Sequence, residues 1–159
     1  MGLQKARWTG ETMSGPGMNQ TYFEQRPAVF LCQAYDSLRE ALEVVLGDRY
    51  HVTAVNHIEA LLSLLKDSTP DLLVIDVDGQ PPLPECLSRV RQSHNSFQVL
   101  LMAGQFSLEQ QLAALQLVPN VGFIQKPFSL ESFLEKVETL IRGYSTSGIR
   151  QRIVRIALS

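Results

Sequence analysis

Hydrophobic runs and amphipathic stretches alternate along most of the chain. Five short runs are almost continuously apolar, which is typical of parallel strands that are buried on both faces. They cover residues 28–32, 50–55, 72–77, 97–103 and 121–125. Apolar residues at helical spacing follow each run. The predicted helices cover residues 37–47, 56–67, a segment that ends near 90, 107–117 and 129–143.

The order of these elements predicts the architecture. Strands that alternate with helices form a parallel sheet joined by right-handed crossovers, which place helices on both faces. We therefore expect an α/β fold with a doubly wound, five-stranded parallel sheet in a flavodoxin-like (βα)5 arrangement. In such sheets ligands bind beyond the carboxyl ends of the strands. The residues that directly follow each strand are therefore the first candidates for chemistry.

Polar residues predict where three of the helices begin. A short polar residue followed three positions later by Glu or Gln is typical of a capping box. Three pairs have this spacing: Ser37 with Glu40, Asn56 with Glu59, and Ser107 with Gln110. Gly47 stands where the first predicted helix is expected to stop.

The two ends of the chain differ from its middle. Residues 1–27 are rich in Gly, Thr, Gln and Met and have no sustained periodicity, so we expect a flexible N-terminal tail before a domain at 28–143. Residues 144–159 read as a linker and a short C-terminal segment. In that segment (149–159) arginines alternate with aliphatic residues, which fits either a solvated tail or a short element that contacts a partner.

Composition narrows the function classes. The chain has 159 residues, 45% of them hydrophobic and 19% charged, and a net charge of −2. This balance predicts one globular domain without the basic excess that nucleic-acid binding needs. No run is long enough to span a bilayer, and because the first residues have no apolar run we expect no signal peptide. Cys32 and Cys86 lack CxxC spacing and read as buried thiols, so we expect a cytoplasmic protein.

The third predicted strand ends on a charge. In the stretch PDLLVIDVDG, Asp76 closes the strand and Asp78 follows two residues later. Lys126 follows the fifth strand, so the predicted topology brings it to the same edge of the sheet as Asp76. The chain has no GxGxxG, no GxxxxGK[ST] and no nucleophile elbow, so dinucleotide, P-loop and triad-hydrolase functions lose their support.

These residues resemble the receiver domain of bacterial two-component response regulators, from about Ala28 to Arg142. The resemblance implies that Asp76 is the phosphoacceptor and that Lys126 contacts the phosphate or pairs with Asp76. It also implies that Phe123 is the switch aromatic and that the peptide bond before Pro127 is cis. For a metal ion it implies two ligands, the carboxylate of Asp76 and the backbone carbonyl of Asp78.

The sequence departs from the receiver pattern at three positions. Gln33 and Ala34 stand where the family has a pair of acids, and Ala103 stands where it has Ser or Thr. Mg²⁺ prefers carboxylate, phosphate and water oxygens, so we expect weak Mg²⁺ binding at most and no required cofactor. Asp76 is then expected to pair with Lys126, which would replace the missing cation.

Three functions are compatible with this sequence. The first is a degenerate receiver, or pseudo-receiver, which signals through protein–protein interaction and is not an enzyme. The second is a phosphorelay response regulator that accepts a phosphoryl group on Asp76 from a histidine kinase. The third is an unrelated flavodoxin-like domain that binds a small molecule or acts as an enzyme. The expected partners are a histidine kinase or an output protein, with neither membrane nor nucleic acid, and a homodimer through the fourth helix, fifth strand and fifth helix.

Overall fold

The computed structural model describes residues 26–93, 97–118 and 120–143. Within them, five parallel strands form one sheet in the order β2-β1-β3-β4-β5. The strands are β1 (Ala28–Cys32), β2 (His51–Val55), β3 (Leu72–Asp76), β4 (Gln98–Ala103) and β5 (Gly122–Gln125). The predicted fold class is confirmed, and the predicted strand ends differ from these by no more than one residue.

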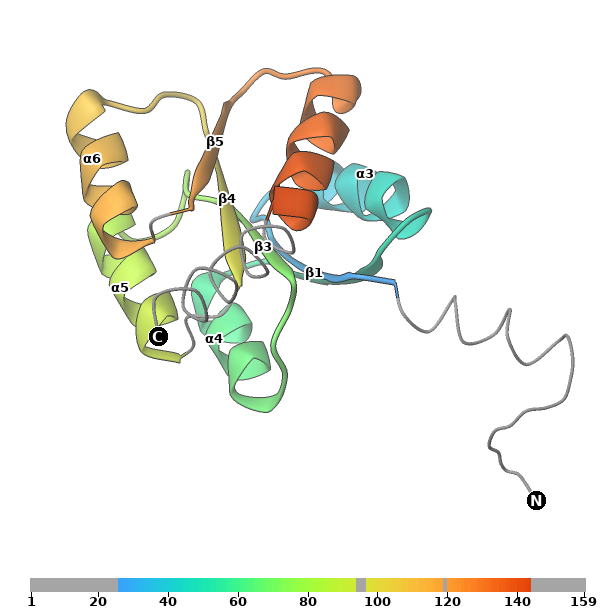
Figure 1. The fold of residues 1–159 in the computed structure, drawn as a ribbon, viewed down its shortest axis with the longest axis horizontal. Helices are drawn as coiled ribbons and strands as arrows, with labels where there is room; N and C mark the ends of the chain where they lie inside the picture. The colour runs from blue at the N-terminus through green and yellow to red at the C-terminus, as the bar shows by residue number, and fades with distance from the viewer. Residues whose placement is uncertain (1–25, 94–96, 119, 144–159) are drawn as a thin grey trace, which may run out of the picture.

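Helices cover both faces of the sheet (Figure 1). They are α3 (Asp36–Gly47), α4 (Ile58–Asp67), α5 (Leu83–Ser93), α6 (Leu108–Leu117) and a helix described over residues 130–143, called the last helix below. The first and the last of these pack on one face, and α4, α5 and α6 pack on the other. None of the described helices is long and apolar enough to cross a bilayer.

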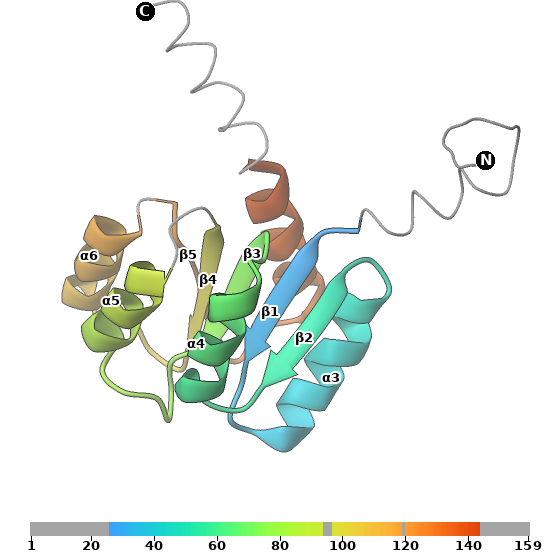
Figure 2. The same cartoon turned by 90° about the horizontal axis from the view of Figure 1, so that it is seen from below.

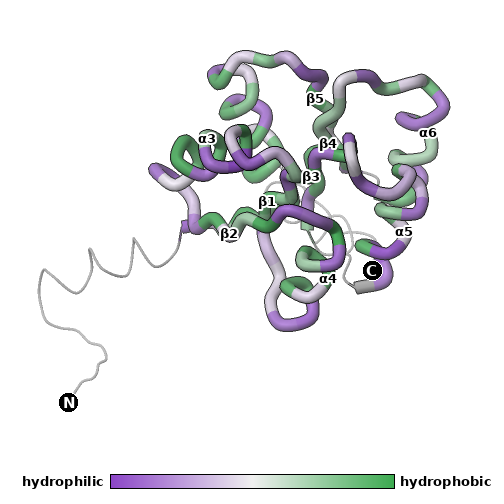
Figure 3. The backbone as a smooth tube through the Cα atoms, turned by 180° about the vertical axis from the view of Figure 1, so that it is seen from behind, coloured by the Kyte–Doolittle hydropathy of each residue, from purple (hydrophilic) through white to green (hydrophobic). Residues whose placement is uncertain are grey.

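The third strand lies at the centre of the sheet, as predicted. Strand β3 pairs with β1 on one side and β4 on the other (Figure 2). All of its residues are buried. Along the helices, hydrophobic and hydrophilic stretches alternate (Figure 3), as expected of helices with one face on the sheet. Two apolar cores result, one around Leu42 and Phe133 and the other around Leu61 and Leu87. These cores fix the sheet register, which decides where each strand delivers its last residue.

Only one of the three predicted capping boxes is present. Ser107 caps α6, and both reciprocal hydrogen bonds with Gln110 form. The Ser37 box is wrong because α3 begins at Asp36, and its N-cap residue, Tyr35, makes no side-chain capping bond. Asp36 instead forms an ion pair with Arg39.

The second helix also begins at a different residue from the one predicted. The cap of α4 is His57, one residue after Asn56, and its ring Nδ1 accepts a hydrogen bond from the Ala60 N–H at 3.2 Å. An imidazole nitrogen serves here as the acceptor that a carboxylate or hydroxyl usually provides. Gly47 is the last residue of α3, and Asp48 forms the cap.

Both cysteines are free and buried, as predicted. Burial raises the pKa of Cys32 to about 12, with smaller contributions from Cys86 and Asp76. Burial likewise raises the pKa of Cys86 to about 11. Because the thiolate is the reactive form, neither cysteine is a candidate nucleophile. The predicted tail and C-terminal segment lie outside the described residues, apart from positions 26 and 27.

Candidate functional site

The carboxyl ends of β1, β3, β4 and β5 deliver the predicted site residues to one edge of the sheet. Asp76 is the last residue of the central strand and lies opposite Met102 of β4 in the register. Gln33 directly follows β1, and its N–H donates to Val55 O at 3.0 Å. Lys126 directly follows β5, and its N–H donates to Ala103 O at 2.8 Å. These main-chain bonds continue the sheet and hold both residues beside Asp76.

Both carboxylate oxygens of Asp76 are engaged. Oδ2 accepts hydrogen bonds from Gln33 Nε2 at 2.6 Å and from Lys126 Nζ at 2.7 Å. Oδ1 accepts from the Asp78 N–H at 3.0 Å. The side chain is fully buried, so these donors replace the water that would otherwise solvate the charge. The predicted pairing of Asp76 with Lys126 is present.

Gln33 is fixed in place as a hydrogen-bond donor to Asp76. Its side chain is completely buried, and Oε1 accepts the Tyr35 N–H at 3.0 Å. An amide whose oxygen takes a main-chain N–H presents its NH₂ group on the other side, and this group meets Asp76. Where a family acid would attract a cation, this chain therefore places a donor. Ala34, the second departure, is half-buried and has no polar side-chain atom.

Lys126 bridges two carboxylates. Its Nζ lies 2.7 Å from Asp76 Oδ2 and 2.9 Å from Asp78 Oδ2. Burial lowers the pKa of Lys126, but the hydrogen bonds and charges of Asp76 and Asp78 outweigh burial and raise this pKa above its ordinary value. The ammonium also lies 5.4 Å from the centroid of the Tyr35 ring, within cation–π range. Lys126 is therefore a fixed cation that two carboxylates share.

Asp78 has a second partner besides the lysine. Its Oδ2 accepts the Gly104 N–H at 2.8 Å, which links the end of β3 to the end of β4. Burial raises the pKa of Asp78, but the Lys126 and Gly104 hydrogen bonds and the Lys126 charge more than offset this, so the pKa is lowered. The sequence pointed to Asp78 as a metal ligand. It gave no signal for the Gly104 contact, because a main-chain donor carries no residue-type signature.

The remaining predicted positions lie around this cluster. Ala103 ends β4, is buried, and has no hydroxyl to offer. Phe123 is half-buried and packs edge-on against Phe106, with ring centroids 5.2 Å apart. Phe106 follows β4 in the loop before α6, and no motif in the sequence marks it as part of the site. The peptide bond between Lys126 and Pro127 is cis, as expected.

The donor set does not fit a resident Mg²⁺ ion. Mg²⁺ needs oxygen ligands in octahedral geometry and usually one or two available carboxylates. Asp76 and Asp78 already share Lys126, and Gln33 turns its NH₂ group toward the place where a ligand oxygen is needed. Among the described residues no group of three His, Cys, Asp or Glu side chains could hold a metal ion. The carboxylates of Asp76 and Asp78 are thus both bound to an internal cation.

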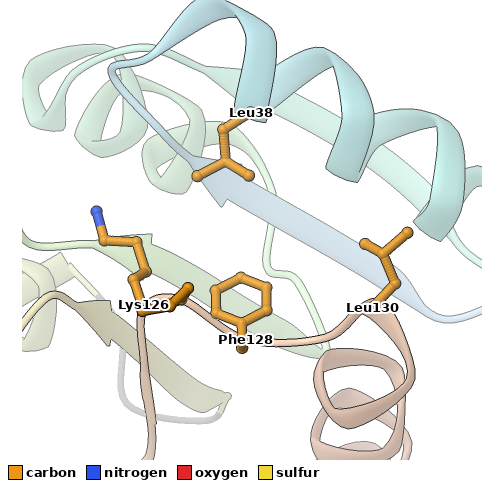
Figure 4. Close-up of a pocket in the computed structure, with 5 residues that line it drawn as sticks. Leu38, Lys126, Phe128 and Leu130 are labelled. Atoms are coloured by element: carbon orange, nitrogen blue, oxygen red, sulfur yellow. The ribbon is translucent and has the colours of Figure 1, made fainter.

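An apolar hollow of about 450 Å³ opens beside the lysine. Leu38 of α3 and Leu130 at the start of the last helix line it, with Phe128 between them and Lys126 at its edge (Figure 4). Pockets that bind small molecules combine apolar walls with several convergent polar groups. Here the lysine is the one charged lining residue, and it is already paired. The hollow therefore gives little support to a small-molecule enzyme or binder.

Comparisons with solved structures identify the fold. The fluoroberyllate-activated receiver domain of NtrC is 27% identical, with a TM-score of 0.62, and the match covers 76% of this chain and 98% of that one. The non-phosphorylated receiver domain of HemR from Leptospira biflexa is 25% identical, with a TM-score of 0.64 and coverage of 72% and 94%. A CheY-like response regulator receiver domain protein from Methanospirillum hungatei is 16% identical, with a TM-score of 0.69 and coverage of 76% and 98%.

These neighbours share one architecture. The chain has the flavodoxin-like fold of response regulator receiver domains, as the sequence resemblance predicted. No family model matches the sequence, and no curated protein matches it either. The likeness therefore lies in the three-dimensional arrangement, and a shared fold alone does not establish a shared function.

Proposed function

We propose that this receiver-fold chain is a non-enzymatic signalling module that acts through protein–protein contacts without metal-dependent phosphorylation of Asp76. The observation that carries the proposal is the bonding of Asp76. Its Oδ2 already accepts from Gln33 and Lys126, and its Oδ1 accepts from the Asp78 N–H. These donors stabilise the buried carboxylate as a structural anion. A carboxylate that is stabilised in this way is a weak nucleophile toward phosphorus.

The chemistry of phosphoryl transfer supports the same proposal. Transfer to a carboxylate brings two anions together, and a divalent metal ion normally neutralises the developing charge. Here the local cation is Lys126, which Asp76 and Asp78 already share. At Ala103 a hydroxyl is missing, and a hydrogen bond to a charged group contributes about 1.5–3 kcal/mol. The site thus lacks two of the stabilising contacts that the reaction needs.

The second candidate is a phosphorylatable regulator. The retention of Asp76 beside Lys126, with Phe123 half-buried nearby, favours it. In that function a phosphoryl group would leave a kinase histidine as its N–P bond breaks, and a new O–P bond would form at Asp76. For this to happen the Gln33 amide would have to release Asp76.

Fluoroberyllate, a phosphoryl mimic, separates the two candidates. We expect the amide NMR spectrum of the full chain to stay unchanged when Mg²⁺ and then fluoroberyllate are added, because Asp76 has no open coordination position. The matched control is Asp76→Asn, which removes the carboxylate but keeps a side chain of similar size. Saturable shifts at Asp76 and Phe123 that appear in the natural sequence and vanish in this variant would establish the phosphorylatable regulator instead.

For the interaction surface we propose the face made by α6, β5 and the last helix, with a second copy of the chain as its partner. Leu108, Leu112 and Leu115 are exposed on α6 at positions i, i+4 and i+7, so they lie on one side of the helix. Exposed apolar patches of this kind commonly mark protein interfaces. Strand β5 is an edge strand of the sheet and lies beside this helix in the fold.

Sedimentation of the full chain tests this surface. We expect a dimer that Leu112→Glu weakens by roughly tenfold or more, because a charge would enter the apolar centre of the contact. Val44→Glu is the matched control, since Val44 is an apolar residue that is more exposed than Leu112 but lies on α3. A natural-sequence monomer at high concentration, or equal weakening by both variants, would rule out this interface.

A further inference from the structure

Asp78 occupies a position where an external anion would be expected to bind. Its Oδ2 accepts from Lys126 Nζ at 2.9 Å and from the Gly104 N–H at 2.8 Å. The same lysine nitrogen lies 2.7 Å from Asp76 Oδ2. An ammonium and a main-chain N–H that converge beside a carboxylate are the donors that an anion delivered to that carboxylate would use. In this chain an internal carboxylate already accepts from both.

Local backbone geometry places Asp78 there. The turn after β3 closes with a hydrogen bond from the Gln80 N–H to Val77 O, and Gly79 adopts a positive φ of +81°. The Asp78 N–H is meanwhile held by Asp76 Oδ1. The main chain is thus fixed on both sides of Asp78, and its side chain extends toward β4 and β5.

Tethering gives this carboxylate an advantage over any free anion. A group joined to its site by a short stretch of chain competes at an effective concentration of at least the millimolar range. Asp78 is two residues from Asp76, and the turn holds it in position. Asp78 therefore outcompetes a dilute external anion for the two donors, Lys126 and the Gly104 N–H.

The same contact anchors the loop between β4 and α6. Gly104 is the first residue of that loop, and Phe106 in its middle packs against Phe123. Ser107 then caps α6 at the end of the loop. The hydrogen bond from the Gly104 N–H to Asp78 therefore fixes the path of the loop from the carboxylate cluster to the start of α6, and no bound ligand is needed for this.

We propose that Asp78 is a built-in anion of this site: its carboxylate takes the place of an external phosphoryl group on Lys126 and Gly104 and holds the loop before α6 in one state. The α6 surface is then presented permanently, with no input at Asp76. This inference rests on the proposed function in one respect, because it assumes that Asp76 takes no phosphoryl group in the natural sequence. It goes further by assigning a role to the side chain of Asp78, which is not the phosphoacceptor.

Asp78→Ala in the full chain tests the proposal. We expect hydrogen exchange at the Gly104 amide to accelerate by about tenfold or more, since its acceptor is lost, and the Phe106 and Phe123 ring resonances to shift. Inorganic phosphate is then expected to bind this variant saturably at millimolar concentration and to reverse those shifts, whereas the natural sequence does not respond. Asp78→Asn keeps an acceptor for Gly104 without the charge and should give an intermediate exchange rate.

The controls separate this inference from the proposed function. Asp71→Asn is the matched variant, because Asp71 Oδ2 also accepts a main-chain N–H, from Ala28 at 2.7 Å, but outside the Asp76 cluster. It should leave Gly104 and phosphate binding unchanged. Unchanged Gly104 exchange in Asp78→Ala, or no phosphate binding by it, would overturn the built-in anion alone. Fluoroberyllate binding by the natural sequence would overturn the proposed function.

Discussion

Replacing Lys126 by methionine is expected to destabilise the protein by about 3–5 kcal/mol. The change removes the cation that Asp76 and Asp78 share and leaves two carboxylates at the same edge. Asp76 is fully buried and cannot recover its solvation from water. Breaking a buried pair by removing one partner is costly for this reason, whereas an exposed pair usually contributes less than about 1 kcal/mol. Urea unfolding at neutral pH measures the difference.

A second substitution shows whether charge is the cause. The double variant Lys126→Met with Asp76→Asn removes the buried unpaired charge of Asp76 together with the lysine and leaves only the more exposed carboxylate of Asp78. We expect it to be more stable than Lys126→Met alone, which a double-mutant cycle would record as coupling between the two positions. A loss below about 1 kcal/mol for Lys126→Met would mean that solvent screens the pair and that Asp76 is not the structural anion described above.

The fold was predictable because its determinants are local. A strand that is buried on both faces must be apolar throughout, so β3 and β4 are visible as runs in the sequence. Helix starts were less predictable, since several polar residues compete for each cap. At α4 the imidazole of His57 took the position expected of Asn56, and at α3 the cap uses no side chain at all.

The sequence predicted only those features of the site that follow from the sheet topology. Parallel strands bring their carboxyl ends to one edge of the sheet, so Asp76 and Lys126 were expected at the same edge, where the lysine side chain reaches past β4 to the carboxylate. The orientation of the Gln33 amide depends on a hydrogen bond to the Tyr35 main chain, which residue types do not indicate. The Asp78 contact with Gly104 likewise depends on the shape of one turn. Because of these two contacts, the site is a cluster of internally hydrogen-bonded side chains, although the family's pair of acids is absent.

Restoring the acids after β1 is expected to create a Mg²⁺ response that the natural sequence lacks. In the double variant Gln33→Asp with Ala34→Asp, the Gln33 amide no longer donates to Asp76 Oδ2, and new carboxylates enter beside it. Without metal, an unpaired carboxylate at the buried Gln33 position should cost about 3–5 kcal/mol of stability. Carboxylates grouped with Asp76 are also the ligands that Mg²⁺ prefers.

Added Mg²⁺ should therefore recover much of this loss. A ligand that binds the folded state alone stabilises it by about 2.7 kcal/mol at one hundred times its dissociation constant, so thermal unfolding with and without Mg²⁺ measures the effect. Gln33→Leu is the control, because it removes the same donor without adding an acid and should not respond to Mg²⁺. Equal melting temperatures for the double variant in both conditions would show that Asp78 and Lys126 exclude the metal even when the family acids are present. In that case the presence of Gln33 in place of an acid would not be the reason why this site fails to bind Mg²⁺.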